Sequence, residues 1–292
     1  MTIVLDERVN SASTSARTEM NLGLTYKSVR ETWALTLFCA IGVLLFEAVI
    51  SYVVITYAPR IVNFWKSLEE SPILEMVSVL MGVDPEKFGG PDQLIALAWV
   101  HPVILATLWA HEITFCTRMP AGEVQRGTSD ILLSWPVPRW TILVSECLVW
   151  MCSGALLFVM VAAGNRVGHY IADTDSPTPV GHILPVLVNF FALYLVVGGV
   201  AWLASVLTDR RGRAISVTFS VVIVSFLINF LVPFWKPAEH VAFLGLLHYY
   251  QPAAILKQGE WPLGNIVTLL SAGFVLWMAS LFIFSRRNVS TS

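Results

Sequence analysis

Six long apolar segments, separated by shorter polar stretches, dominate the hydrophobic pattern of the chain. A helix of about 20 apolar residues is long enough to cross the hydrocarbon layer of a bilayer. Every backbone N–H and C=O inside lipid must bond within its own structure, and the barrel type of alternation is absent from these segments, so we expect helices. The expected spans are residues 33–57, 94–116, 141–163, 183–207, 214–234 and 266–284.

The polar stretches divide into several kinds. Residues 1–20 are rich in Ser, Thr and Arg, and we expect this cytoplasmic N-terminus to be disordered. Residues 21–30 (NLGLTYKSVR) are expected to form a short elbow helix on the membrane surface. Residues 235–263 are too apolar for free solvent and too often interrupted by proline to span, so they predict re-entrant or interfacial helices on the outer face. Residues 21–292 then form a single all-α membrane domain.

Composition supports a membrane protein. The 292 residues are 56% hydrophobic and 13% charged, with a mean hydropathy of +0.69, whereas a soluble domain carries about 25% charged residues. The net charge of −2 gives no indication of a nucleic-acid partner. Four cysteines lie in or at the ends of apolar segments without a C-x-x-C pair, which is typical of small buried hydrophobes.

Basic residues predict the orientation. With the N-terminus in the cytoplasm, twelve of the 18 Lys and Arg residues fall inside and six outside. The inside set is Arg8, Arg17, Lys27, Arg30, Arg118, Arg126, Arg139, Arg210, Arg211, Arg213, Arg286 and Arg287; the outside set is Arg60, Lys66, Lys87, Arg166, Lys236 and Lys257. We therefore expect both termini to be cytoplasmic.

The stretch 121–140 (AGEVQRGTSDILLSWPVPRW) is too polar for lipid and has the residues of a short helix. Gly127 can end one helix in the left-handed conformation, and Thr128 can cap the next. Asp130 then complements the positive helix end. Residues 131–133 supply an apolar ridge, and Pro136 prevents the helix from continuing. The pattern predicts a helix of about two turns over 128–135, shaped to dock into a groove on a partner.

The ordered residues of this stretch resemble the coupling-helix segment of type-2 ABC exporter permeases. A glutamate, an R-G-T, an L-L and a P-V-x-R follow the second span in that family. The matching positions are Glu123, Arg126, Gly127, Thr128, Asp130, Ile131, Leu132, Leu133, Pro136 and Arg139. The resemblance implies a bacterial or archaeal cytoplasmic-membrane protein that acts as a dimer, either of two identical copies or with a similar chain. Two cytoplasmic ATPase subunits would dock on these segments, with ATP and Mg²⁺ bound by the ATPase.

The chain contains no G-x-x-x-x-G-K-[ST] sequence, so it has no phosphate-binding P-loop of its own. If ATP drives transport, a second polypeptide hydrolyses it, and we expect this chain to be no enzyme and to bind no cofactor. Arg210, Arg211 and Arg213 form either a second contact with the ATPase or a positive-inside anchor.

Glu47 lies near the middle of the first expected span, where a carboxylate is costly and is a functional candidate. It is either a proton or cation contact or a hydrogen-bonded latch between helices. The alternative function is therefore an ion-driven secondary transporter or channel that uses Glu47 and outer histidines. Its transported ion would be a proton or a metal. The histidines concerned are His101, His169, His182, His240 and His248, whose irregular spacing does not indicate a metal site. His111-Glu112 begins like a zinc-protease motif, but Phe115 stands in place of the second histidine.

Overall fold

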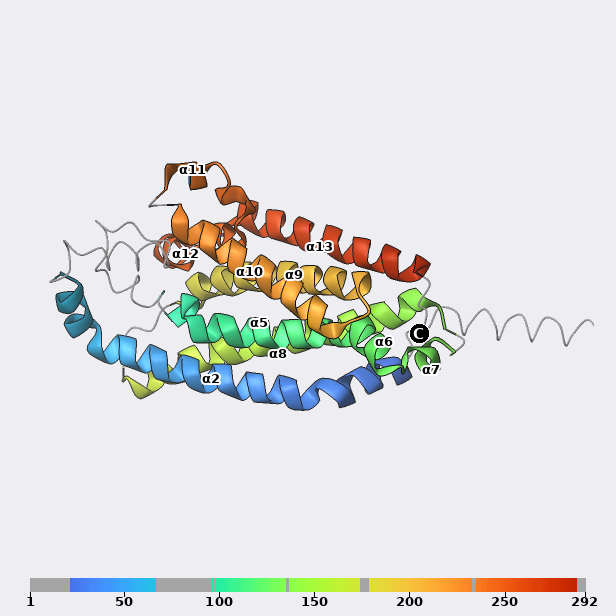
Figure 1. Ribbon diagram of the computed structural model, residues 1–292. Coiled ribbons are helices and arrows are strands. Elements are labelled where there is room, and N and C mark those ends of the chain that lie inside the picture. Colours follow the sequence, from blue (N-terminus) through green and yellow to red (C-terminus); the bar gives the residue numbers. More distant parts are fainter. Residues whose placement is uncertain are drawn as a thin grey trace, which may run out of the picture.

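The computed structural model describes residues 22–66, 96, 98–134, 137–173, 179–232 and 235–287. Five long helices form the bundle and run roughly parallel along its length (Figure 1). They are α2 (Leu22–Lys66), α8 (Arg139–Ile171), α9 (Val180–Leu207), α10 (Arg211–Leu231) and α13 (Leu263–Arg286). Each contains a stretch long and apolar enough to cross a membrane, and no strand occurs in the described residues. The expectation of an all-α membrane protein is confirmed.

The second expected span, 94–116, is broken. Its described part is α5 (Pro102–Cys116), a helix of 15 residues that starts after the non-helical His101. Fifteen residues extend about 22 Å, short of the roughly 30 Å of a hydrocarbon layer. Pro102 sits in the first turn, where its missing N–H is tolerated, and it separates α5 from the helical residues before it. The described chain thus contains five candidate spans, with α5 as a shorter sixth helix inside the bundle (Figure 1).

The expected elbow helix over 21–30 is not separate. Residues 22–30 are the first turns of α2, which continues without a break to Lys66. Leu24, Ser28 and Thr32 are all buried and lie four residues apart, so they share one face of the helix. Packing of this face against the bundle makes residues 22–30 part of α2 instead of a separate surface helix.

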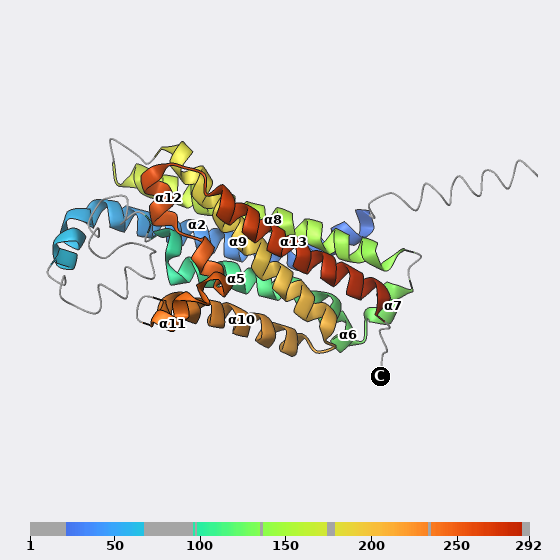
Figure 2. The ribbon, with the colours of Figure 1, turned by 90° about the horizontal axis from the view of Figure 1, so that it is seen from above.

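Short helices close the end of the bundle that carries α11 and α12 (Figures 1 and 2), which we call the far end. They are α11 (Lys236–Glu239), η3 (Ala242–Leu244), η4 (Leu246–Tyr249) and α12 (Pro252–Gln258). The Tyr250 hydroxyl, between η4 and α12, donates a hydrogen bond to the Trp99 carbonyl at 3.1 Å, and Ile255 and Leu256 are buried. The interrupted stretch before the last helix therefore folds back on the bundle instead of spanning it.

Two glycines let α8 lie against the backbone of α2. A Cβ added at Gly164 would overlap the Leu44 carbonyl, and one at Gly168 would lie 2.6 Å from the Ala48 carbonyl oxygen. Glycines four residues apart place two such close approaches on one helix face, as in membrane helix pairs. The α2–α8 pair is consequently held in a single register.

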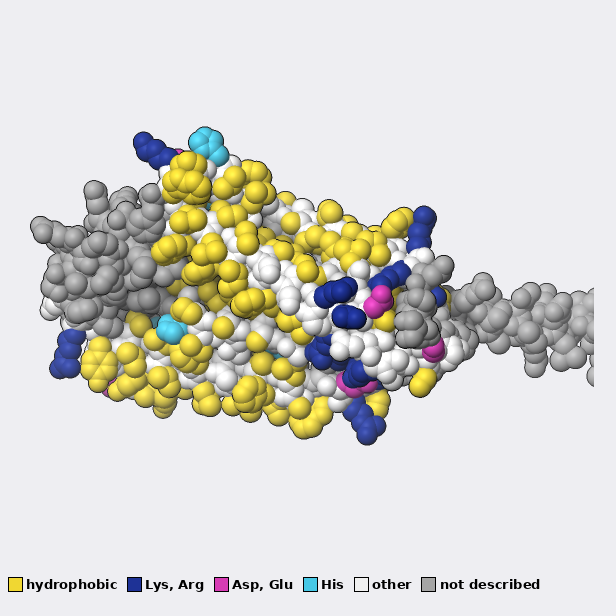
Figure 3. Space-filling model, viewed as in Figure 1, with side chains coloured by type: hydrophobic (Ala, Val, Ile, Leu, Met, Phe, Trp, Pro, Cys, Tyr) yellow, Lys and Arg dark blue, Asp and Glu magenta, His cyan; other side chains and the backbone are white. Residues whose placement is uncertain are grey.

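The surface separates by polarity along the bundle axis (Figure 3). Apolar side chains cover its middle, while Lys, Arg, Asp and Glu gather at the end that carries α6 (Glu123–Arg126) and α7 (Ser129–Leu133). We call this the coupling end. The first described turns of α2 and the C-terminal end of α13 also lie there (Figure 1). An apolar belt with charges at its edge is the surface expected of a protein that sits in a bilayer.

Candidate functional site

The coupling end is built around a sharp turn between α6 and α7. Gly127 ends α6 with φ 70°, the left-handed conformation that glycine adopts without strain. Its N–H donates to the Val124 carbonyl at 3.0 Å, and the Thr128 N–H donates to the Glu123 carbonyl at 3.1 Å. These bonds satisfy carbonyls at the end of α6. The helix end expected at Gly127 is present.

The expected cap at Thr128 is wrong. Thr128 has helical backbone angles, φ −93° and ψ −4°, and its side chain makes no capping bond to α7. Its hydroxyl instead turns back to the Glu123 carboxylate and to the Glu123 carbonyl, 3.3 Å away. The next helix, α7, has five residues, so it is shorter than the two turns expected over 128–135. Trp135 and Pro136 lie outside the described residues.

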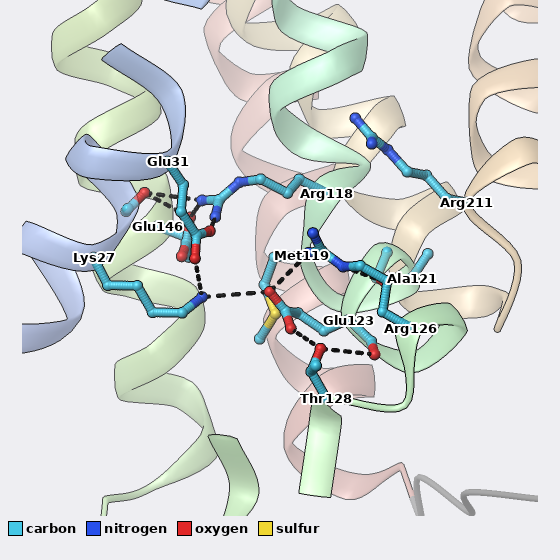
Figure 4. A network of polar contacts seen from close by, with 12 residues as sticks. Lys27, Glu31, Arg118, Met119, Ala121, Glu123, Arg126, Thr128, Glu146 and Arg211 are labelled. Atoms are coloured by element: carbon cyan, nitrogen blue, oxygen red, sulfur yellow. Dashed lines mark hydrogen bonds and ion pairs between the residues drawn. The ribbon is translucent and has the colours of Figure 1, made fainter. Parts of the chain in front are cut away.

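Glu123 is the centre of this turn. Only 6% of its surface is exposed, and its carboxylate accepts hydrogen bonds from Thr128, from Arg126 at 3.0 Å and from Lys27 at 3.3 Å (Figure 4). Burial by itself raises the pKa of this carboxyl, but the Thr128 bond and the charges of Lys27 and Arg126 outweigh it, so the pKa lies below its usual value. Glu123 is therefore a carboxylate that joins α6 and α7 to the start of α2.

Arg118 is a second centre, on η2 (Arg118–Gly122), the irregular turn between α5 and α6. Its buried guanidinium forms ion pairs with Glu31 of α2 and Glu146 of α8, and donates to the Ser28 hydroxyl at 3.0 Å. Ser28 in turn donates to Glu146 at 2.7 Å. Figure 4 shows these side chains converging from three elements. Sequence reasoning counted Arg118 only as an inside charge, because partners 28 and 87 residues away leave no local pattern.

The ends of α9 and α10 also hold the turn. The Ser205 hydroxyl of α9 donates to the Met119 carbonyl at 3.0 Å and accepts from the Ala121 N–H at 3.2 Å. At the start of α10, the Arg211 N–H donates to the Gln125 side chain at 2.9 Å, and its guanidinium donates to the Thr114 carbonyl at 2.9 Å. Arg211 thus points into the protein, whereas Arg210 and Arg213 are exposed.

A sequence profile described as ABC-2 family transporter protein matches residues 25–287. The chain belongs to this ABC-2 transporter family. The match covers nearly all of the described helices and the whole coupling end. No curated protein and no solved structure matches the chain. Permeases of this family are multi-pass membrane subunits of ABC transporters and are not themselves catalytic, and the family implies a partner ATPase subunit in general.

The permease exposes part of its expected coupling surface. Ile131 is 67% exposed on α7, and Asp130 beside it is also exposed. Leu132 and Leu133 belong to α7, but their side chains lie outside the described set. Arg139, at the start of α8, is turned inward and donates to the Arg287 carbonyl. Of the expected apolar ridge, Ile131 is the residue whose side chain is described, and it faces outward.

Arg287 links the last helix to the same end of the permease. Its guanidinium donates to the Val206 carbonyl at 2.6 Å and forms an ion pair with Asp209 at 2.6 Å. Because Arg139 donates to the Arg287 carbonyl, the ends of α8, α9 and α13 meet here. These contacts join helix ends that lie far apart along the chain, with long apolar segments between them.

Glu47 lies away from the coupling end, buried between α2 and α8. Ser51 and Asn165 donate to one of its carboxylate oxygens at 3.2 and 3.3 Å. This is the arrangement of a latch between two helices, one of the two roles left open by the sequence. Two of the outer histidines have separate backbone partners: His169 contacts the Asn165 carbonyl and His182 the Leu256 carbonyl, both at 2.8 Å. Within the described ranges, no three His, Cys, Asp or Glu residues gather as a metal site would require.

Proposed function

We propose that this chain is the permease subunit of an ATP-driven exporter, and that a separate cytoplasmic ATPase docks on the segment 121–140. One observation carries the proposal: an exposed apolar tip, Ile131, belongs to a turn that is bonded to the ends of the long helices. The turn is linked to α2 by Lys27, to α9 by Ser205 and to α10 by Arg211. An isolated surface loop would not need such links.

The contacts suggest how a push would be transmitted. ATP binding closes the two ATPase subunits, and their movement displaces α7. Glu123 and the Gly127 turn keep α6 and α7 together, because charge-assisted hydrogen bonds are stronger than neutral ones. The displacement then reaches α2, α9 and α10 through Lys27, Ser205 and Arg211. Tilting of these helices in two facing permease copies opens a path between them.

The topology of the proposal has six crossings. The sixth crossing is formed by α5 together with the helical residues 98–100 before it. The C-terminal end of α13 and the start of α2 lie at the same end of the bundle (Figure 1), as an even number of crossings requires. The larger share of basic residues at this end supports a cytoplasmic location for both termini. ATP and Mg²⁺ belong to the ATPase, since this chain has no P-loop sequence.

The test is binding between the purified permease and a P-loop ATPase without membrane spans from the same organism, chosen as the candidate partner. Ile131→Ala should weaken the complex about tenfold, which is the effect of losing about 1.4 kcal/mol from an apolar anchor at the centre of an interface. Leu207→Ala is the matched control, since Leu207 is an equally exposed apolar residue at the end of α9. Equal binding of Ile131→Ala and wild type, measured by titration in detergent, would show that the ATPase does not dock on α7.

A further inference from the structure

Glu112 is a fully buried carboxyl group that the coupling end does not use. It lies on α5 with 0% of its surface exposed. Neither carboxylate oxygen has a hydrogen-bond partner in the described part of the chain, and no ion pair involves Glu112 there. The carboxylate faces the backbone N–H of Gly198, in the interior of α9. An N–H at such a position bonds to the carbonyl four residues earlier in its own helix, so it does not replace a dedicated partner for Glu112.

The carboxyl group sits where α5, α8 and α9 meet. A Cβ added at Gly198 of α9 would lie 2.7 Å from the Glu112 carboxylate and would overlap the ring of Trp150, on α8. Only a glycine leaves room for both side chains at this position. The ring of Trp150 stacks on Tyr194 of α9, and its indole N–H lies near the Tyr194 hydroxyl. The unpaired Glu112 carboxylate and the Trp150 ring therefore adjoin the same glycine.

The surroundings contain polar and titratable groups from each neighbouring helix. His111, next to Glu112, lies 3.1 Å from the Thr36 hydroxyl of α2 and 3.2 Å from the Tyr194 hydroxyl of α9. Cys116 and Tyr194 lie within electrostatic range of Glu112. The further titratable groups around these two are Cys39 of α2, Cys147 and Glu146 of α8, and Arg118 at the coupling end.

A carboxylate without a cation or a hydrogen-bond donor is very costly inside a protein core or a membrane. Buried ion pairs offset that cost by their mutual attraction, and Glu146 has such a partner in Arg118. Glu112 has none among the described side chains. Binding one proton removes the charge, since the carboxylate and the proton become a neutral acid and no other reactant is needed. The neutral acid also provides an O–H donor.

From this geometry we infer that Glu112 is a proton-binding site in the centre of the protomer, where α5, α8 and α9 converge. The inference does not depend on ATPase docking, because it rests on burial and missing partners alone. It does have a consequence for coupling. Glu112 lies six residues before Arg118, about 9 Å along a helix, so a displacement of the coupling end that moves α5 changes the surroundings of the bound proton.

Infrared spectroscopy of the full chain in lipid nanodiscs tests the inference, because a neutral carboxylic acid and a carboxylate absorb at different frequencies. Wild type should show the C=O stretch of an acid without a strong hydrogen bond. Glu112→Gln, which has the shape of the neutral acid, should remove that band. Glu47→Gln is the matched control: Glu47 is equally buried but hydrogen-bonded to Ser51 and Asn165, so its substitution should leave the band.

Two further measurements keep the inference testable if Glu112→Gln folds poorly. Glu112→Asp retains an acid on a shorter side chain and should shift the band. Transfer of wild type to D2O should also shift it, since a binding site exchanges its proton with solvent. A wild-type spectrum without the band would overturn the inference. So would a band that is unchanged in the Glu112 variants, or one that never shifts in D2O.

Discussion

At the scale of single residues, the buried carboxylates of this permease differ in what compensates their charge. Glu146 is paired with Arg118, and Glu123 with Lys27 and Arg126. Glu47 accepts two neutral hydrogen bonds, and Glu112 accepts none in the described structure. The two groups with cationic partners lie at the coupling end, while the other two lie among apolar helices. Charge pairing therefore organises the coupling end, whereas the two interior carboxyl groups have no cationic partner among the described residues.

Glu123→Gln should remove the pH dependence of the coupling end. The pKa of Glu123 lies below its usual value of about 4.3, so its stabilising contribution is complete above that pH and is lost as the pH falls through the folded-state pKa. At neutral pH the substitution should lower the free energy of unfolding by about 1.5–3 kcal/mol, the range for a hydrogen bond to a charged group. Thermal unfolding in detergent, from neutral to strongly acidic pH, measures both effects.

The control for this prediction is Glu260→Gln, at an exposed carboxylate of the far end. It should behave like wild type at every pH. A Glu123→Gln protein with the same acid sensitivity as wild type would mean that other carboxylates produce the effect.

Arg118→Met should be strongly destabilising, because it leaves the buried Glu146 carboxylate without its cation. Removing one partner of a buried ion pair typically costs about 3–5 kcal/mol. Adding Glu146→Leu to Arg118→Met removes the second charge as well and should recover a large part of the loss. Unfolding midpoints of the single and double variants provide the comparison, and a double variant no more stable than Arg118→Met would contradict the assigned pairing.

At the scale of elements, close backbone approach fixes the α2–α8 pair. Gly164 and Gly168 of α8 face the carbonyls of Leu44 and Ala48. Ser28 and Glu146 add a hydrogen bond between the same helices near the coupling end. The register between α2 and α8 is therefore fixed both by steric fit in the apolar region and by polar contacts near the coupling end.

Gly164→Ala should destabilise the permease by about 1–3 kcal/mol, the usual cost of inserting a methyl group into a packed interface. The added Cβ would meet the backbone carbonyl of Leu44, which cannot rotate away. Gly42→Ala on α2 is the control, since nothing lies within 4 Å of its Cβ position. The control should be neutral or gain up to about 1 kcal/mol from helix propensity. Equal unfolding midpoints for the two variants would rule out a tight seam at Gly164.

At the scale of the whole molecule, the path of α5 decides the topology. Five helices are long enough to cross a membrane, and five crossings alone would leave the termini on opposite sides. The views of Figures 1 and 2 place α5 alongside α2, α8 and α9, within the bundle. In the proposed topology, α5 is a sixth crossing that returns the chain to the coupling end. The apolar belt of Figure 3 lies between that end and the far end.

Reporter fusions test this topology. A fluorescent protein that folds only in the cytoplasm should be active when attached before Leu22 and also when attached after Arg287. A fusion between α8 and α9 should be inactive, because the end of α8 and the start of α9 lie at the opposite end of the bundle (Figure 1). Activity of only one terminal fusion would show an odd number of crossings, with α5 outside the membrane-spanning set.

Local sequence signals were sufficient for the membrane class, for most helices and for the turn at Gly127. Apolar length specifies a span directly, and a left-handed helix end depends on one residue and its immediate neighbours. Likewise, the prolines around α12 predicted a short helix before the last span. Such features involve bonds within a few residues, so the pattern contains them.

Tertiary structure alone decided which distant groups meet. Ser28 and Glu146 are 118 residues apart, and Arg118 and Glu31 are 87 apart, so only packing brings them together. Three further features likewise depend on packing that the sequence pattern does not contain. They are the unbroken path of α2 from Leu22 to Lys66, the hydrogen bond of the Thr128 hydroxyl to the Glu123 carboxylate, and the lack of hydrogen-bond partners at Glu112 among the described residues. The physical reason is range: hydrophobic length and turn preference act along the chain, whereas charge compensation and steric fit act through space.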